Sequence, residues 1–326
     1  MIVDLLDLAL GNLLSPIILC FALGLFAALA RSDLTIPEAV AKGMSIYLLF
    51  AIGFKGGVAV DTAGFSGTLV GALLAGVFLS FALPLIAFGL LRVMTALSTL
   101  DAAAVAAHYG SISIVTFVAG TSVLDSAGLT YDGWMVAVAA AMEAPAILSA
   151  LWLVARSGSG RQMDSDLWRE ILLNGSIVLL VGSFAIGWIT GPEGLARIES
   201  FIVSPFQGVL CLFLLDMGLV AGRGLRGARG ILRPGLLAFG ILMPLIGATA
   251  GAAAGVGLGL GTGSVMLMMV LGASASYIAV PAAMRVALPE ANPSVYLTLS
   301  LGVTFPFNLT LGLAIYLAVA RMLTGG

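Results

Sequence analysis

The sequence is poor in charge: Asp, Glu, Lys and Arg make up only 9 % of its 326 residues, whereas apolar residues make up 60 %. This balance excludes an ordinary soluble domain, in which about 25 % of residues are charged, and it predicts an integral membrane protein. The net charge is −2, and no stretch of basic residues interleaved with aromatic ones is present, which excludes nucleic-acid binding.

The side chains that commonly perform catalysis are also scarce. The chain has two cysteines, Cys20 and Cys211, and one histidine, His108. Both cysteines lie in apolar runs, which favours packing at membrane depth over a disulfide or a metal site. No paired carboxylates or second histidine are placed for hydrolysis, and no phosphate-binding loop of the P-loop type is present. We therefore expect neither an ATPase nor a membrane hydrolase, and no enzyme cofactor.

Ten apolar stretches are long enough to cross a bilayer, which takes about 20 residues per helix. Backbone groups find no water in hydrocarbon and must bond within the segment, so these runs predict helices, and they are too long for barrel strands. The sequence thus predicts an all-α membrane protein with spans at about 13–30, 39–55, 67–91, 100–118, 133–155, 171–189, 205–221, 234–256, 265–284 and 295–320.

The two halves of the chain repeat each other at a spacing of 163 residues. The sequence FALG at 21–24 recurs as FAIG at 184–187, and SIS at 111–113 recurs as SAS at 274–276. Five helices per half is an odd number, so the second copy must insert upside down, as in many secondary transporters. We predict two inverted five-helix repeats, 1–156 and 171–326, joined by a short cytoplasmic linker at 157–170.

The basic residues indicate an orientation. Lys and Arg on alternate sides of the ten predicted spans divide eleven to three. Because these residues concentrate in cytoplasmic loops, the richer side is expected to face the cytoplasm and both termini the outside. Four of the arginines fall in one loop, 222–233. They can serve as the topology signal alone, or they can dock a cytoplasmic partner or lipid head groups.

Small polar residues interrupt the fourth and ninth predicted spans, which suggests broken helices in the core. The sequences are HYGSIS at 108–113 and GASASY at 272–277, the second followed by Pro281. A half-helix that begins at such a break points free N–H groups into the bundle, and serine hydroxyls add donors suited to a small planar anion. Close helix packing selects the same small residues, but the recurrence in both repeats favours a site. The predicted substrate-binding residues are Gly110, Ser111, Ser113, Ser274, Ser276 and Tyr277.

A second group of polar residues suggests a cation site. Glu143 lies mid-span, and the repeat offset places TFPFN at 304–308 opposite it. Carboxylate, hydroxyl and amide oxygens are hard ligands that suit Na⁺. The predicted cation-binding residues are Thr116, Glu143, Thr304 and Asn308, with Glu143 and Asn308 as Na⁺ ligands. Glu143 could instead be a buried protonated acid or a partner of His108. For Asp216 we expect a structural ion pair with Lys42 or Arg223.

Several short motifs, taken together in their order, resemble the sodium-dependent bicarbonate permease family of SbtA-type transporters over essentially the whole chain. They are IPE at 36–38, GFKGG at 53–57, ASAS at 273–276 and PEANPS at 289–294. The resemblance implies a Na⁺-coupled bicarbonate importer of the bacterial inner membrane. It also implies a homotrimer with elevator-like motion of a core against a gate and, in some members, a cytoplasmic regulator of the PII type. Tyr277 stands where some members carry a carboxylate.

Two other functions stay open at this point. The chain could be a Na⁺- or H⁺-coupled permease for another small anion, such as a short carboxylate. It could also be a membrane scaffold that transports nothing and binds a partner through the arginine-rich loop at 222–233.

Overall fold

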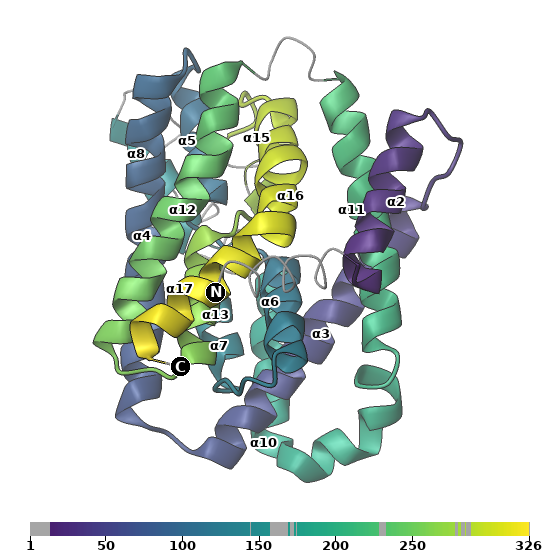
Figure 1. Cartoon of the computed structure of the whole chain (residues 1–326), viewed down its shortest axis with the longest axis vertical. Helices are drawn as coiled ribbons and strands as arrows, with labels where there is room; N and C mark the ends of the chain where they lie inside the picture. The colour runs from purple at the N-terminus through teal and green to yellow at the C-terminus, as the bar shows by residue number, and fades with distance from the viewer. Residues whose placement is uncertain are drawn as a thin grey trace.

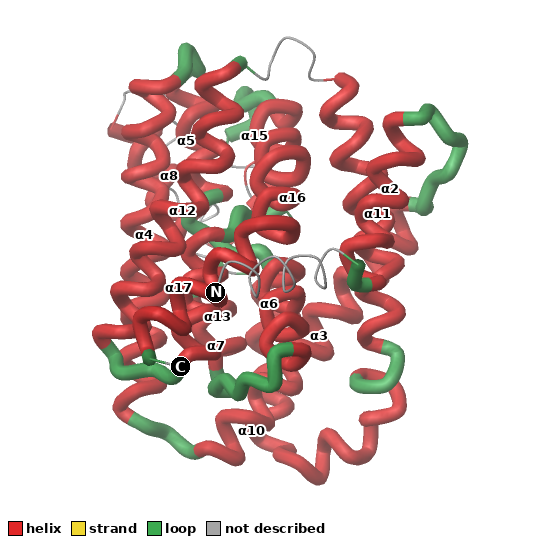
Figure 2. The backbone as a smooth tube through the Cα atoms, in the orientation of Figure 1, coloured by secondary structure: helices red, strands yellow, loops and turns green. Residues whose placement is uncertain are grey.

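The computed structural model describes residues 14–143, 145–156, 169, 173, 175–227, 233–277, 280–281, 284 and 288–325. Within these ranges every regular element is a helix, as Figure 2 shows. The prediction of an all-α chain is therefore confirmed for the described residues. Apart from Arg169, the predicted linker at 157–170 lies outside them.

Figure 1 shows how the described helices are arranged. Their bounds are α2 (Pro16–Leu29), α3 (Glu38–Ala63), α4 (Gly67–Met94), α5 (Thr99–His108), α6 (Ile114–Ser126), α7 (Met135–Ala141), α8 (Pro145–Arg156), α10 (Gly175–Ile202), α11 (Phe206–Gly227), α12 (Pro234–Gly257), α13 (Thr262–Ala273), α15 (Pro293–Leu299), α16 (Phe305–Phe307) and α17 (Leu313–Thr324). Two π-helical segments, Ser300–Thr304 and Asn308–Gly312, flank α16.

Seven of the described helical stretches are long and apolar enough to cross a membrane, and three apolar helices are shorter. The shorter ones, α2, α6 and α13, fall on the predicted first, fourth and ninth spans. Large apolar side chains such as Phe26, Phe78 and Ile189 are 69 %, 69 % and 81 % exposed, as expected for surfaces that face hydrocarbon. The chain is thus a multi-pass membrane protein, and the count of ten spans stays a prediction. The seven long stretches are Glu38–Ala63, Gly67–Met94, Met135–Val154, Ile177–Ile202, Phe206–Gly227, Pro234–Gly257 and Pro293–Thr324.

Two predicted spans differ from the observed helices. The fourth, expected at 100–118, is divided into α5 and α6 and continues to Ser126. The fifth, expected as one helix at 133–155, is interrupted between α7 and α8. There the Ser80 hydroxyl donates to the Met142 carbonyl at 2.7 Å, and Pro145 has no N–H with which to continue the helical bonding. The break in the fourth span was expected from its sequence, whereas the interruption in the fifth was not, because the Ser80 hydroxyl comes from another part of the chain.

Four helices form what we call the scaffold unit: α2 packs along α11, α3 packs along α10, and α11 also contacts α3. Glycines allow the backbones to approach closely. A Cβ atom added to Gly24 of α2 would lie 2.0 Å from the Leu215 carbonyl oxygen, and one added to Gly187 of α10 would lie 2.0 Å from that of Phe54. Such small-residue seams are a common way to join helices in membranes.

The remaining helices, α4 to α8, α12, α13 and α15 to α17, form the core unit. Helices α5 and α13 lie at its centre, and residues 102–108 and 263–273 are buried on every side. A helix that is apolar all round belongs in such a place, and the Ala-rich and Met-rich sequences of these two helices fit it. The core unit meets the scaffold unit where α7 contacts α3 and α10 and where α15 contacts α11.

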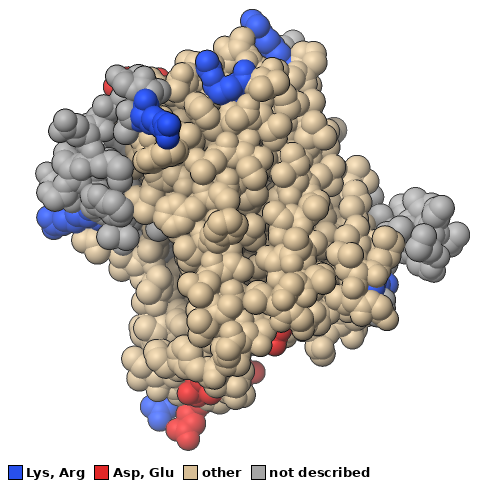
Figure 3. Space-filling model, turned by 90° about the vertical axis from the view of Figure 1, so that its left-hand side faces the viewer, with Lys and Arg blue, Asp and Glu red and all other residues tan. Residues whose placement is uncertain are grey.

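The two ends of the molecule differ in charge. On the face drawn in Figure 3, Lys and Arg gather mostly at the upper end and Asp and Glu mostly at the lower end. This polarity is of the kind that the positive-inside rule describes. Which end faces the cytoplasm stays a prediction.

The close approach of α3 and α10 can be tested at Gly187. The Gly187→Ala variant should lower the free energy of unfolding by about 1–3 kcal/mol, because the new methyl group would force the two backbones apart. The melting temperature in detergent measures this loss. The matched control is Gly182→Ala in the same helix, where an added Cβ meets nothing within 4 Å. Equal melting temperatures for the two variants would contradict the predicted seam.

Candidate functional site

The two interrupted helices cross at their breaks. Helix α5 ends at His108 and helix α13 ends at Ala273. The Ser276 N–H donates to the His108 carbonyl at 2.8 Å, and the Ser113 N–H donates to the Ser274 hydroxyl oxygen at 3.0 Å. Backbone donors freed by one break are therefore satisfied by the other, which is what the interior of a membrane protein requires.

Ser113 is the centre of a buried hydroxyl cluster. It is the N-cap of α6, and its hydroxyl oxygen accepts from the Thr116 N–H at 3.1 Å and from the Thr116 hydroxyl at 2.8 Å. Its own proton goes to the Tyr277 hydroxyl oxygen at 2.9 Å. The Tyr277 hydroxyl also interacts with the Thr116 side chain, so these three residues form one hydroxyl network. Hydroxyl groups are donors that a small anion could use in this network.

Glu143 lies next to this cluster at the α7–α8 interruption. Its Oε2 accepts a hydrogen bond from the Ser111 hydroxyl at 3.1 Å, and both residues are buried. No partner is recorded for Oε1 in the described part of the chain, so that oxygen can take a proton or a cation. An ionisable side chain at membrane depth is costly and marks a functional position by default.

The last membrane stretch contributes two polar side chains, each in a π-helical segment. Tyr109 donates to the Thr304 hydroxyl at 2.6 Å, and Thr304 donates on to the Gly240 carbonyl at 2.7 Å. The amide of Asn308 donates to the Ala273 carbonyl at 2.9 Å and accepts from the Tyr316 hydroxyl at 2.7 Å. Thr304 and Asn308 are thus each hydrogen-bonded to a residue next to a helix break. π-Helical turns are frequent at functional sites.

The structure brings the predicted substrate residues together more closely than the predicted cation ligands. Ser113, Ser274 and Tyr277 belong to one hydrogen-bonded cluster, and Ser276 lies at the same crossing. The four predicted cation ligands are bonded to separate groups, and no bond joins any two of them. In the described ranges no three His, Cys, Asp or Glu residues come close enough to hold a metal ion. The assigned roles remain predictions.

Gly110 has a packing reason to be glycine. A Cβ atom added there would lie 2.2 Å from the Pro84 Cγ and 2.8 Å from the Ser80 carbonyl oxygen. The first break therefore rests directly on α4. Its predicted part in substrate binding is untested.

His108 has an unusual hydrogen-bonding state. Its Nδ1 lies 2.6 Å from the Ala104 carbonyl, which can only accept, so this nitrogen carries the proton. The ring stacks on Tyr296 with centroids 4.6 Å apart, and the buried Nε2 has no hydrogen-bond partner. Its backbone carbonyl receives the Ser276 N–H. His108 is thus held firmly at the break, and no hydrogen bond to Glu143 is recorded.

Sequence reasoning missed two partners in this region and misplaced one ion pair. The hydroxyls of Ser80 and Tyr109 were not expected to hold the breaks, although Tyr109 adjoins one and its position was a usable signal. The side chain of Arg223 donates to the Leu34 carbonyl at 3.0 Å and acts on Asp216 only from a longer distance. The expected ion pair of Asp216 with Lys42 or Arg223 is not recorded within 4.0 Å among the described residues.

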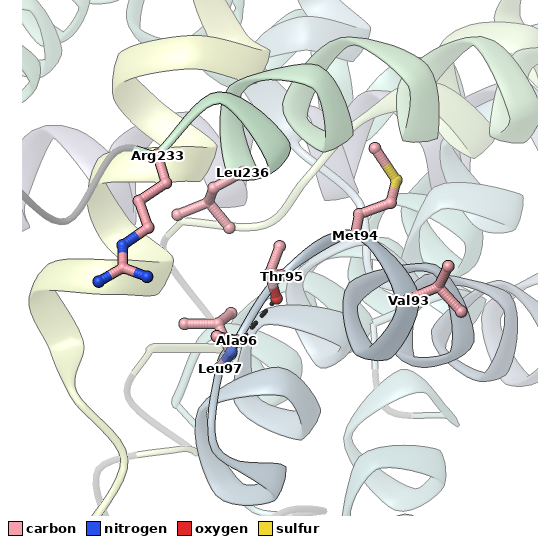
Figure 4. Close-up of a pocket in the computed structure, with 7 residues that line it drawn as sticks. All are labelled: Val93, Met94, Thr95, Ala96, Leu97, Arg233 and Leu236. Carbon is pink, nitrogen blue, oxygen red and sulfur yellow. Dashed lines mark hydrogen bonds between the residues drawn. The ribbon is translucent and has the colours of Figure 1, made fainter.

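A separate pocket of about 480 Å³ lies at the arginine-rich end, between the α4–α5 connection and the start of α12 (Figure 4). Arg233 is the one charged residue among its described lining residues, and the pocket shares none of these with the helix breaks. The pocket is therefore no part of the candidate site. Its lining consists of Val93, Met94, Thr95, Ala96, Leu97, Arg233 and Leu236.

Interrupted helices that meet at a buried polar cluster, inside a helical membrane protein, are the architecture of a secondary transporter. The model of the Na⁺-dependent bicarbonate transporter superfamily matches residues 16–321 of this chain. The chain belongs to this superfamily, and bicarbonate and Na⁺ are the substrates that membership implies. No curated protein matches the chain.

The crossing of the breaks can be tested at Ser274. The Ser274→Ala variant should raise the bicarbonate concentration for half-maximal uptake about 10-fold, which corresponds to roughly 1.4 kcal/mol. The control is Ser264→Ala in the same helix. Ser264 likewise accepts a backbone N–H, from Asp132 at 2.9 Å, and donates its own proton, but it lies away from the breaks. Equal uptake by both variants would contradict the site.

Proposed function

We propose that this chain imports bicarbonate together with Na⁺ across the bacterial inner membrane by an elevator-like alternating-access mechanism. The observation that carries the proposal is the crossing of two interrupted helices at a buried cluster of hydroxyl donors, with the carboxylate of Glu143 beside it. Donors suit the anion, and the carboxylate suits the cation. Each ion then offsets the charge of the other in an apolar surrounding.

The helix bounds support an inverted repeat of five helices. Shifting α4 by 163 residues places its last residue on Gly257, where α12 ends, and shifting α5 places its first residue on Thr262, where α13 begins. The pairing of helices follows the same rule, since α2 with α11 repeats the arrangement of α10 with α3. Repeats of this kind place their substrate near the middle of the membrane.

The division into two units supports motion of one against the other. The scaffold unit is joined by backbone contacts at Gly24, Gly57 and Gly187, so its helices cannot easily slide. Both breaks and Glu143 belong to the core unit. A core that carries its ions past a rigid scaffold would expose them alternately to the two sides.

The alternatives from the sequence are weaker on this structure. A non-transporting scaffold protein would not need two broken helices that satisfy each other at membrane depth. The docking loop at 222–233 lies partly outside the described residues. Trimer formation and a PII-type regulator stay expectations from the family resemblance, as does the outward placement of both termini.

The first experiment is uptake of labelled bicarbonate into proteoliposomes under an inward Na⁺ gradient, compared with an equal K⁺ gradient. We expect accumulation only with Na⁺. Uptake that ignores bicarbonate but responds to a short carboxylate would move the substrate to another anion. Absence of any flux through folded protein would overturn transport.

The cation role of Glu143 gives a separate prediction. The Glu143→Gln variant keeps the shape and the acceptor for Ser111 but loses the charge. It should raise the Na⁺ concentration needed for half-maximal uptake about 10-fold or more. Uptake measured against Na⁺ at fixed bicarbonate checks this. Glu199→Gln, an exposed acid of α10, is the control. An unchanged Na⁺ dependence in the Glu143 variant would remove the assignment.

A further inference from the structure

Lys55 is placed unlike the other basic residues. It lies eight residues before the end of α3, about 12 Å along the helix at 1.5 Å per residue. Every other Lys or Arg in the described helices lies within five residues of a helix end. A charge this far inside a membrane span is rare, and such charges mark the pathways of substrates and ions.

The surroundings of Lys55 belong to both units. Its ammonium group lies 5.0 Å from the centroid of the Phe206 ring, on α11 of the scaffold unit. The acidic residue that acts on it is Asp125, at the end of α6 in the core unit, and no ion pair within 4.0 Å joins the two. The next residue, Gly56, faces Val136 of α7. Lys55 therefore stands at the boundary between the scaffold and the core.

Helix α6 connects this boundary with the candidate site. Its first turn is capped by Ser113 of the hydroxyl cluster, and its last turn carries Asp125. The helix has 13 residues and is about 20 Å long. Lys55 is thus close to the end of α6 that lies opposite the hydroxyl cluster. We predict that this end of the molecule faces outside.

The second repeat carries a charge at the matching place. An added Cβ on Gly57 would touch the Phe184 carbonyl, and one on Gly218 would touch the Phe21 carbonyl. Phe21 and Phe184 are themselves equivalent at the spacing of 163 residues. Gly57 therefore corresponds to Gly218, and two residues earlier Lys55 corresponds to Asp216. The scaffold unit therefore carries a cation on α3 and a carboxylate at the equivalent position of α11.

We infer that Lys55 recruits the transported anion: its ammonium group raises the local concentration of bicarbonate in the outer approach between scaffold and core. The inference rests on the proposed function. An ammonium without a direct ion pair keeps most of its field for a passing anion, and walls of low polarity concentrate that field. Asp125 works against the recruitment, because its carboxylate repels the same anion.

The test compares rates of Na⁺-dependent bicarbonate uptake at low bicarbonate, where the rate reports capture of the anion, with the maximal rate. Lys55→Gln should lower the low-concentration rate about 3- to 10-fold and leave the maximal rate within about twofold. Lys55→Arg keeps the positive charge and should capture bicarbonate at low concentration at the wild-type rate. Asp125→Asn should raise it about twofold. Lys42→Gln, at the other end of α3, is the control and should match wild type.

The direction of the Asp125 variant separates recruitment from a structural contact. If Lys55 and Asp125 only held the core in place, both variants would change uptake in the same direction, and that result would overturn the inference. Normal capture by folded Lys55→Gln would also overturn it. Lack of bicarbonate uptake by the wild type would instead refute the proposed function, and the inference with it.

Discussion

The structure depends on one constraint: backbone groups freed by a broken helix at membrane depth need partners from within the protein. Here the two breaks supply them to each other, through the Ser276 N–H on the His108 carbonyl and the Ser113 N–H on the Ser274 hydroxyl. The crossing brings hydroxyl groups from both halves of the chain into one buried cluster. The site is therefore a product of the same bonds that make the fold tolerable in a membrane.

The scaffold meets the same constraint in the opposite way. Three of its four helices are long, and glycines let neighbouring helices approach until their backbones touch. The one marked departure is the bend in α10, where Gly191 has a φ of 56° and Pro192 follows. An L-residue with a side chain rarely adopts that dihedral angle. The closely packed helix pairs of the scaffold unit therefore lie beside a core unit whose helices are interrupted, and we expect the two units to differ in rigidity.

The sequence predicted those features that depend on residues close together in the chain. Long apolar runs gave the helices, and Gly and Ser in matching positions gave both breaks. It did not predict the interruption at Glu143, because the hydroxyl that holds it comes from Ser80, more than 60 positions earlier. The same holds for Thr304, whose partners Tyr109 and Gly240 lie on two other helices. The substrate cluster was foreseeable from repetition, whereas the geometry around each predicted cation ligand depends on contacts that only folding creates.

The saturation of Ser113 has a thermodynamic consequence. Its hydroxyl group already accepts two hydrogen bonds and donates one, so an arriving anion gains a bond from it only by displacing a partner. Such an exchange yields little net energy, since one bond replaces another. High affinity for the anion would slow its release on the other side of the membrane, and a transporter must both bind and release its substrate. A self-satisfied cluster of this kind favours a shallow binding well and rapid turnover.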